Sequence, residues 1–488
     1  MNVTQPGQVG LPSAASREPA RIRRCDLFVD HHRRPKLRGH VKCARFVAGL
    51  VFAAFVSAGL TYGAEIARSA PNILVIVTDD QRAGTLDVLP ATKRLFFQSG
   101  RAFRPAYVTT PLCCPSRGSI FTGLFAHNHG IRTNGTSHLP QDRTMQRYLH
   151  DSGYRTAVLG KYLNSWPLNR DPPHFDRWAL VRPDSYWNGD FNVNGRVTTL
   201  PGYVTDVLAS RSVQILSAFD RSDDAAPWFM YVATTAPHAP VIPEPRYANV
   251  AVPPWHLSPA VLESDRSDKP PWVRERTAPL DQVRDFRERQ LQTLMSVDDL
   301  VAKIFDRLGS LRERRRTLAI FLSDNGVYWG EHGLREKGLP YTDDVAVPFA
   351  LRWPGHIDPG TTDRRNATNV DVAPTVLAAA GIAPLQPVDG RSLLDSWTRQ
   401  RVFTEHWGHL SGLPNWAAVR TKWAHYVEYY NDDFSKIVFR EFYRLSRDPW
   451  ELRNLLHDGV RSNNPDTSQL HAWISQYRSC SGLSCPGW

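Results

Sequence analysis

The fold and the chemistry of this chain are decided by one segment, CCPSRGSIFTG, at residues 113–123. Pro115 and Ser116 favour the start of a helix, so we expect Cys113 at a helix N-terminus, where the positive end of the helix dipole attracts an anion. Arg117 would lie one turn further along and could hold two oxygens of an oxyanion. A capped helix that carries an ordinary thiol is the structural alternative.

Four apolar runs rich in β-branched residues stand on either side of this segment. Continuous apolar runs of this length are typical of strands buried on both faces, as in a parallel sheet covered by helices. Amphipathic stretches between the runs predict the covering helices, which makes the expected fold an α/β sandwich. The predicted strands are 73–77, 154–159, 228–233 and 318–322, and the predicted helices are 144–152, 203–219, 290–308 and 371–380.

Two further regions have their own composition. Residues 239–285 are rich in proline, tryptophan and charge, which predicts a long loop over the sheet. Trp255 and Trp272 in this loop offer flat faces to a sugar ring, or they only pack the loop in place. After a turn at residues 389–390 the pattern changes to short alternating runs, which predict a small antiparallel sheet. Its predicted strands are 417–420, 422–427 and 442–445.

Polar side chains follow the predicted strands at the points where they end. In open α/β sheets, ligands bind outside the carboxyl ends of the strands. Each of these residues alone could be a helix cap, an Asx turn, a solvated lysine or a structural histidine. Together they supply three carboxylates and one amide oxygen, which suit calcium or magnesium rather than zinc. The residues are Asp79, Asp80, Lys161, His238, Asp324 and Asn325.

Charge and composition limit the classes of function. With 42% hydrophobic and 22% charged residues, the chain of 488 residues is globular and is not disordered as a whole. The net charge of +11 is uneven, because residues 1–64 carry ten basic and three acidic residues and so account for +7 of it. The remainder is only mildly basic, and we expect no nucleic-acid partner.

The N-terminal region predicts export. Lys42 and Arg45 precede the apolar run 46–60, and small residues follow at 61–64. This pattern is typical of a signal peptide that is cleaved near Ala64. The run is short for a membrane span, which needs about twenty residues, although an uncleaved anchor is the alternative. We therefore expect a secreted, periplasmic or cell-envelope protein, in which Cys480 and Cys485 can form a disulfide.

The segment 113–123 resembles the signature of the type I, formylglycine-dependent sulfatases, in which Cys, one residue, Pro-Ser-Arg and later Thr-Gly follow one another. The resemblance covers nearly all of residues 71–488 and is greatest to the N-acetylglucosamine-6-sulfatases and the extracellular heparan endosulfatases. Its other markers are GKYLN (160–164), PH (237–238), LMSVDDLV (294–301), SDNG (323–326), Lys337, WPG (353–355) and SCSGLSC (479–485).

The resemblance implies an alkaline-phosphatase-like fold, with a large, mostly parallel sheet between helices and a small C-terminal domain with an antiparallel sheet. We expect a basic prelude and signal peptide at 1–64, the sulfatase catalytic domain at 65–389 and a small α+β domain at 390–488.

The resemblance also implies that a formylglycine-generating enzyme converts Cys113 to formylglycine (3-oxoalanine). A thiolate is a poor ligand for a hard cation, whereas a hydrated aldehyde offers one oxygen to the metal and one for attack. The implied metal site holds Ca²⁺, with Mg²⁺ as the alternative. Its ligands are Asp79, Asp80, the modified residue 113, Asp324 and Asn325.

The remaining site residues receive roles from the same resemblance. Arg117 steadies the formylglycine hydrate, Lys161 and His238 contact the sulfate, and Lys337 offsets its charge. His238 is the expected proton donor to the departing alcohol. His332 either approaches the substrate or supports its loop. Many sulfatases have a histidine where this chain has Leu163, which leaves the base for the second step unassigned.

The implied activity is hydrolysis of sulfate esters, with the 6-O-sulfate of N-acetylglucosamine or glucosamine in a sulfated glycan as the expected substrate. A phosphate or phosphonate ester hydrolase that uses the same formylglycine site is one alternative, and a catalytically silent sugar-binding protein is another. Exo or endo action and the oligomeric state stay open.

Overall fold

The computed structural model describes residues 70–221, 226–408 and 412–486. The predicted signal peptide, including the run 46–60, lies outside the described residues. Within the described ranges, no helix combines the length and the apolar character that a membrane crossing requires.

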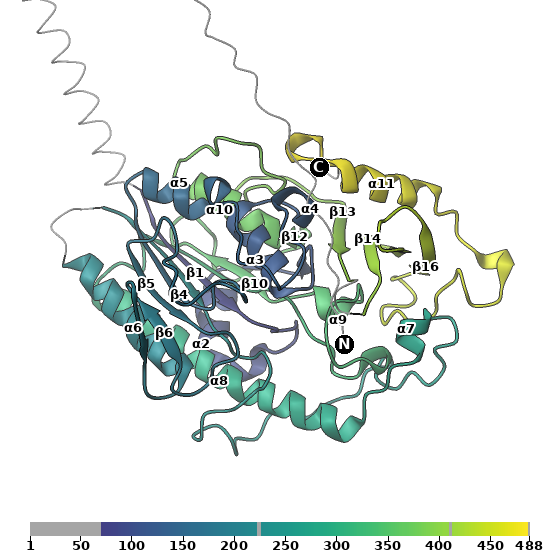
Figure 1. Ribbon diagram of the computed structural model, residues 1–488, viewed down its shortest axis with the longest axis horizontal. Coiled ribbons are helices and arrows are strands. Elements are labelled where there is room, and N and C mark those ends of the chain that lie inside the picture. The colour runs from purple at the N-terminus through teal and green to yellow at the C-terminus, as the bar shows by residue number, and fades with distance from the viewer. Residues whose placement is uncertain (1–69, 222–225, 409–411, 487–488) are drawn as a thin grey trace, which may run out of the picture. The chain divides into compact units, whose positions relative to one another are not determined.

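The main body is built on a ten-stranded sheet in the order β11-β2-β10-β9-β1-β8-β4-β5-β6-β7 (Figure 1). Its five central strands, β9, β1, β8, β4 and β5, run parallel, which confirms the predicted parallel sheet. The parallel strands are β1 Asn72–Thr78, β4 Arg155–Gly160, β5 Arg177–Val181, β8 Trp228–Ala233 and β9 Thr317–Ser323. The outer strands, of which β11 and β7 form the two edges, are β2 Arg101–Phe103, β6 Asp190–Val193, β7 Arg196–Thr199, β10 Phe349–Arg352 and β11 Thr361–Asp363.

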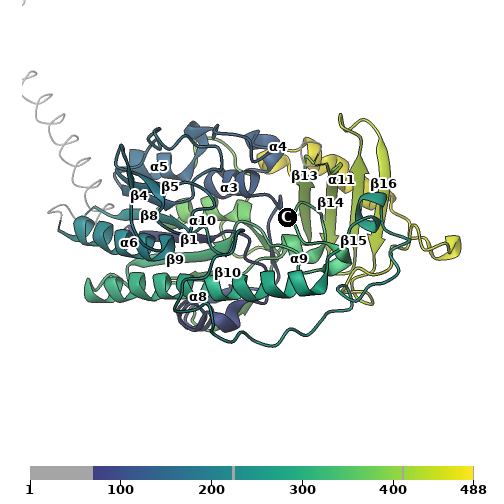
Figure 2. The ribbon, with the colours of Figure 1, turned by 60° about the horizontal axis from the view of Figure 1, so that its bottom comes forward.

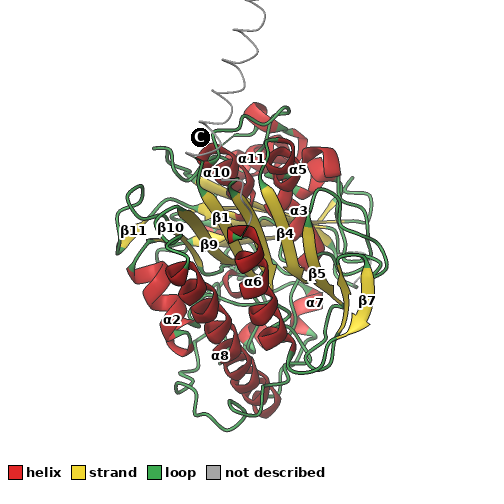
Figure 3. Ribbon diagram, turned by 90° about the vertical axis from the view of Figure 1, so that its left-hand side faces the viewer, coloured by secondary structure: helices red, strands yellow, loops and turns green. Residues whose placement is uncertain are grey.

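Helices cover both faces of this sheet because successive side chains of the central strands point to opposite sides. In β1, Ile73 and Val75 pack in one apolar cluster, whereas Leu74 and Ile76 pack in another. Figure 3 shows α6 and α8 in front of the sheet and α3, α5 and α10 behind it. The covering helices are α3 Cys113–Thr122, α5 Met145–Asp151, α6 Val204–Asp220, α8 Leu280–Ser310 and α10 Val372–Ala379.

The predicted loop 239–285 is shorter than expected. A short helix, α7 Pro271–Arg274, interrupts it, and α8 begins at Leu280 rather than at residue 290. Trp272 packs edge-on against Tyr429, with ring centroids 5.0 Å apart. This contact favours the packing alternative for that tryptophan.

The predicted small antiparallel sheet is present, in the order β13-β14-β15-β16. Figure 2 shows it beside the large sheet, with α8 running below the latter. Residues 422–424 form the turn between β14 and β15, not the start of a strand as predicted. The elements are β13 Arg401–His406, β14 Asn415–Thr421, β15 His425–Tyr430, β16 Ile437–Tyr443 and the helix α11 Ser468–Ser479.

A disulfide joins Cys480 and Cys485 just after α11. The remaining elements are short, and two of them, β3 and β12, pair in parallel as a separate two-stranded sheet. They are α2 Pro90–Thr92, β3 Ala106–Tyr107, α4 Ala126–His129, α9 Thr342–Val345 and β12 Ala367–Thr368, besides a few turns of 3₁₀ or π helix.

Candidate active site

Two acidic segments meet at the carboxyl edge of the large sheet. Asp79 and Asp80 follow β1, and Asp324 follows the neighbouring strand β9, in which Ser323 pairs with Thr78. The backbone N–H of Asp80 donates to Asp324 Oδ1 at 3.2 Å. Asp80 has a positive φ of 67°, which is uncommon for a residue with a side chain. This backbone conformation places three buried carboxylates side by side.

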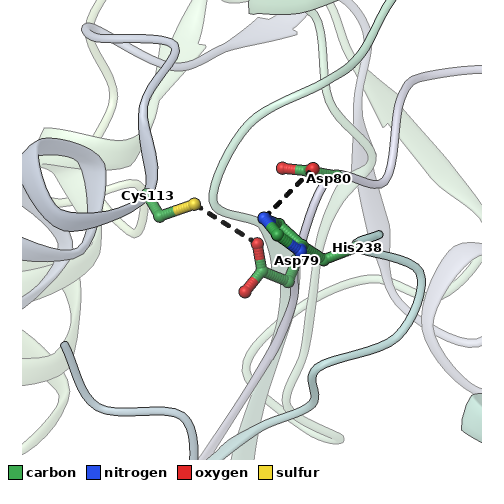
Figure 4. Close-up of side chains that lie close together, drawn as sticks. All are labelled: Asp79, Asp80, Cys113 and His238. Carbon is green, nitrogen blue, oxygen red and sulfur yellow. Dashed lines mark hydrogen bonds and ion pairs between the residues drawn. The ribbon is translucent and has the colours of Figure 1, made fainter. Parts of the chain in front are cut away.

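Cys113 lies against these carboxylates. It is the first residue of α3 and is fully buried. Its Sγ donates to Asp79 Oδ1 at 3.4 Å, and Lys337 Nζ lies 2.9 Å from the sulfur. Figure 4 shows the thiol pointing at Asp79, with His238 beside the two aspartates. The predicted position at a helix N-terminus is therefore found, and it faces the candidate metal ligands.

Cys114 points elsewhere. Its Sγ lies 3.3 Å from Asn164 Oδ1, and its backbone N–H donates to Asn134 Oδ1 at 2.9 Å. Burial raises the pKa of the Cys114 thiol to about 12. Of the two adjacent cysteines, only Cys113 faces the acidic cluster.

Arg117, one turn along α3, ties the cluster together. Its Nε donates to Asp324 Oδ2 at 2.8 Å, and its Nη2 donates to Asp79 Oδ2 at 3.1 Å. Its Nη1 donates to the carbonyl of Lys161 at 2.7 Å. The guanidinium is thus occupied by carboxylates rather than open to an oxyanion, and it acts on position 113 by orienting Asp79.

Lys161 reaches the cluster from the end of β4. Gly160, the last residue of that strand, has a φ of 87°, and a Cβ there would lie 1.8 Å from the carbonyl oxygen of Ala233. Only glycine permits this approach of β4 to β8. Lys161 is fully buried, with its Nζ 2.5 Å from Asp79 Oδ2. Both oxygens of Asp79 therefore face site residues.

Lys337 completes the cluster from the loop after β9. Its Nζ donates to Asp80 Oδ1 and lies 3.5 Å from Asn325 Oδ1. The loop is held by Asp344, whose Oδ2 accepts from the N–H of Gly338 at 2.5 Å. From the small sheet, Trp416 Nε1 donates to the carbonyl of Gly338 at 2.8 Å.

His238 approaches from the loop after β8. Its Nε2 lies 3.8 Å from Asp80 Oδ2, and its Nδ1 lies 3.1 Å from Asp184 Oδ1. Burial lowers the pKa of His238, but Asp80 and Asp79 outweigh burial and raise it to about 11. Both ring nitrogens of His238 thus face carboxylates, an arrangement that favours a proton on the imidazole. Asp184, which the sequence did not indicate, orients it.

The carboxylates differ in their titration. Burial alone would raise the pKa of Asp79, but Lys161, His238 and Arg117 outweigh it, and its pKa lies well below the usual range. Burial and the charge of Asp79 raise the pKa of Asp324 despite the nearby arginine. Two crowded carboxylates of this kind favour a further cation between them.

The donor set fits a hard divalent ion except at one position. Asp79, Asp80, Cys113 and His238 each present a ligand atom within 4.8 Å of the others. The carboxylates of Asp79, Asp80 and Asp324 and the amide oxygen of Asn325 are donors that calcium and magnesium accept. The sulfur of Cys113 is the misfit, because soft thiolates select other metals.

Two candidate residues lie outside this cluster. His332 is buried, with its Nδ1 2.7 Å from Glu263 Oε2, and its ring lies against Tyr341. These contacts favour the loop-supporting alternative. Leu163 is buried in the apolar core behind α3 and offers no base.

The sequence model of the sulfatase family matches residues 71–382, which include every residue of the cluster. The chain belongs to the sulfatase family. A second model, described as the C-terminal part of N-sulphoglucosamine sulphohydrolase, matches residues 330–479.

Individual sulfatases are similar over most or part of the chain. The N-acetylglucosamine-6-sulfatase of Homo sapiens is 30% identical over 87% of this chain and 87% of its own length. An extracellular sulfatase Sulf-1 homolog of Caenorhabditis elegans is 35% identical over 67% of this chain. The chain spans about half, 49%, of the length of that relative.

Solved structures share the fold. A protein solved in complex with its substrate D-glucosamine-2-N,6-O-disulfate superimposes with a TM-score of 0.74 at 22% identity, over 83% of this chain and 97% of that one. A phosphonate monoester hydrolase of Agrobacterium radiobacter superimposes with a TM-score of 0.61 at 21% identity. The predicted sandwich is thereby confirmed as the sulfatase fold.

Proposed function

We propose that this protein hydrolyses sulfate esters with a formylglycine made from Cys113. The observation that carries the proposal is the position of Cys113, which opens α3 and contacts Asp79 and Lys337. An oxygen in place of the sulfur would complete a set of hard donors. Conversion of Cys113 to formylglycine provides this oxygen, which the cysteine itself cannot supply.

The ion that fits the donor set is Ca²⁺, with Mg²⁺ as the alternative, and it would be held by Asp79, Asp80, Asp324, Asn325 and residue 113. When bound, it withdraws charge from the sulfate oxygens. Arg117 stays on Asp79 and Asp324 and keeps their oxygens turned toward the ion, which is the role that its hydrogen bonds support.

The reaction proceeds in two steps. A hydroxyl of the hydrated residue 113 releases its proton to solvent and attacks the sulfur, and the bond between sulfur and the sugar oxygen breaks. His238 donates its proton to that oxygen, so that the sugar leaves as an alcohol. The ammonium groups of Lys161 and Lys337 offset the charge of the sulfate. Loss of the proton from the second hydroxyl to solvent then expels sulfate and restores the aldehyde, and addition of one water molecule to the aldehyde regenerates the hydrate for the next turnover.

The substrate that we propose is the 6-O-sulfate of N-acetylglucosamine or glucosamine in a sulfated glycan. The relatives named as N-acetylglucosamine-6-sulfatases support it, since one of them matches 87% of the chain. A primary sulfate ester projects from its ring, so a buried site such as that around Cys113 need admit only this arm.

We further propose that residues 65–389 form the catalytic domain and residues 390–488 the C-terminal domain. We also propose that the protein is exported. The extracellular relatives support export. N-terminal sequencing of secreted protein should give a start near Ala64, and a purely cytosolic distribution would contradict this.

The activity is tested with paired substrates. Purified protein should hydrolyse an aryl sulfate much faster than the matching aryl phosphate or phosphonate. A reversed preference would favour the alternative of a phosphate or phosphonate ester hydrolase. A panel of sulfated monosaccharides that differ only in sulfate position should show preference for the 6-O-sulfate. Efficient removal of 2-O- or 3-O-sulfate with no 6-O activity would overturn the substrate but not the reaction.

A further inference from the structure

A cavity of about 910 Å³ lies outside the site, bordered by loops of the large sheet and by the small sheet. We call it the basic groove. Its lining contains no carboxylate and five cationic residues, which are Arg104, Arg364, Arg399, Arg401 and Lys422.

Most of these charges are not neutralised. Arg399 forms an ion pair with Asp371 at 2.7 Å. The other four form no ion pair with any carboxylate in the part of the chain that the structure describes. Arg401 stacks over the ring of Trp473 at 4.3 Å, and its Nε has no hydrogen-bond partner there. Four unpaired cations around one concavity produce a positive potential that attracts a polyanion.

The groove also offers an aromatic surface. Trp423, in the turn between β14 and β15, is 61% exposed. Its neighbour Lys422 places its Nζ 4.7 Å from the ring centroid. An exposed indole beside cations suits a ligand that combines flat apolar ring faces with negative groups, which describes a sulfated sugar chain.

The register of the large sheet places the groove at the same edge as the site. β10 runs antiparallel to both β9 and β2, so β2 runs parallel to β9. Phe349 pairs with Leu322, and the next residue of β10 pairs with Ala102. Arg104, two residues further along β2, is therefore level with Ser323, the residue before Asp324.

Arg364 stands at the same height, because it follows β11, whose last residue, Asp363, pairs with Phe103. β2 and β9 are separated by β10 alone, which corresponds to about 10 Å between their axes. Figure 3 shows β11 and β10 beside β9, at the left of the sheet. The distance between groove and site is one that a short oligosaccharide can span.

We propose that the basic groove binds a second stretch of the same glycan chain whose 6-O-sulfate enters the site at Cys113. The choice of a sulfated glycan as ligand rests on the proposed function. The guanidinium groups of Arg104 and Arg364 bind sulfate groups with two hydrogen bonds each, and Trp423 stacks on a sugar ring. The protein therefore prefers sulfated chains to sulfated monosaccharides.

The binding test uses a double charge reversal, Arg364→Glu with Lys422→Glu, both at exposed positions. The matched control, Arg196→Glu with Lys436→Glu, makes the same change of net charge at exposed positions away from the groove. In a Cys113→Ala background, binding of a heparin octasaccharide should weaken about tenfold in the groove variant and less than about twofold in the control. Equal loss in both variants, or none in the groove variant, overturns the proposal.

The kinetic test uses the same two double variants with Cys113 intact. The groove variant should lose about tenfold in kcat/KM on the octasaccharide and keep its kcat/KM on N-acetylglucosamine 6-sulfate. A single-stranded oligonucleotide of equal charge that binds more tightly than heparin overturns the assignment to a glycan. If no sulfate ester is hydrolysed while heparin binding still depends on the groove, the proposed function fails and the groove assignment stands.

Discussion

Replacing Arg117 by methionine should destabilise the protein strongly. The guanidinium is fully buried and contacts Asp79 at 3.1 Å and Asp324 at 2.8 Å, with both carboxylates also fully buried. Removal of one partner of a buried ion pair costs about 3–5 kcal/mol, because it leaves charge without compensation. In Arg117→Met, Lys161 still compensates Asp79, so Asp324 suffers most.

The assay is equilibrium urea unfolding in EDTA, followed by tryptophan fluorescence. We expect Arg117→Met to lower the free energy of unfolding by about 3–5 kcal/mol and the exposed control Arg196→Met to change it by less than about 0.5 kcal/mol. Adding Asp324→Asn to Arg117→Met should recover about 1–3 kcal/mol, because the uncompensated charge is gone. A loss below about 1 kcal/mol in Arg117→Met, or no recovery in the double variant, would refute the assignment of Arg117 as the electrostatic tie of the site.

Three further predictions concern the nucleophile, the metal and pH. Cys113→Ala should abolish sulfatase activity while Cys114→Ala retains much of it, and tandem mass spectrometry should find formylglycine at Cys113; unmodified Cys113 in fully active protein contradicts this. Asp324→Ala should lose bound calcium, as measured by elemental analysis, and should lose sulfatase activity. Stoichiometric zinc in the active protein would rule out the assignment of a calcium or magnesium site. Burial lowers the pKa of His127, but Glu405, 2.8 Å away, outweighs it and raises the pKa above the ordinary 6.5. The stability that this pair contributes is complete below the pKa of His127 in the unfolded chain and is lost as pH rises through its pKa in the folded protein. In urea unfolding, His127→Gln should therefore lower the free energy of unfolding more at about pH 6 than at about pH 9. An equal loss at both pH values would contradict this prediction.

The strands of the large sheet could be predicted because their apolar runs are continuous. Helix α8 was predicted only in part, because residues 280–289 are mostly charged and the apolar spacing becomes regular only from Leu291 on. β13 was missed because RVFTEH has no continuous apolar run, and its burial comes from tertiary contacts such as those of Phe403 with Phe125 and Tyr477.

The cluster around Cys113 could be predicted because the carboxyl ends of parallel strands meet at one edge. Asp184 could not, since it lies in the connection between β5 and β6 and reaches His238 only through the tertiary fold. The same holds for Asn134, which accepts from the backbone of Cys114 across twenty residues of chain. Local sequence carries no signal for either contact.

The hydrogen bond from Trp416 to Gly338 has a consequence for any shortened form of the protein. Every proposed catalytic residue precedes residue 390, yet the turn that carries Lys337 rests on an indole from β14, which is fully buried. A fragment that ends before the small sheet would keep every proposed catalytic residue but would lose the contact that supports the turn of Lys337. Truncation of the chain after residue 389 should therefore inactivate the enzyme without removing its nucleophile, and an inhibitor that loosens the small sheet would act at a distance from the sulfate.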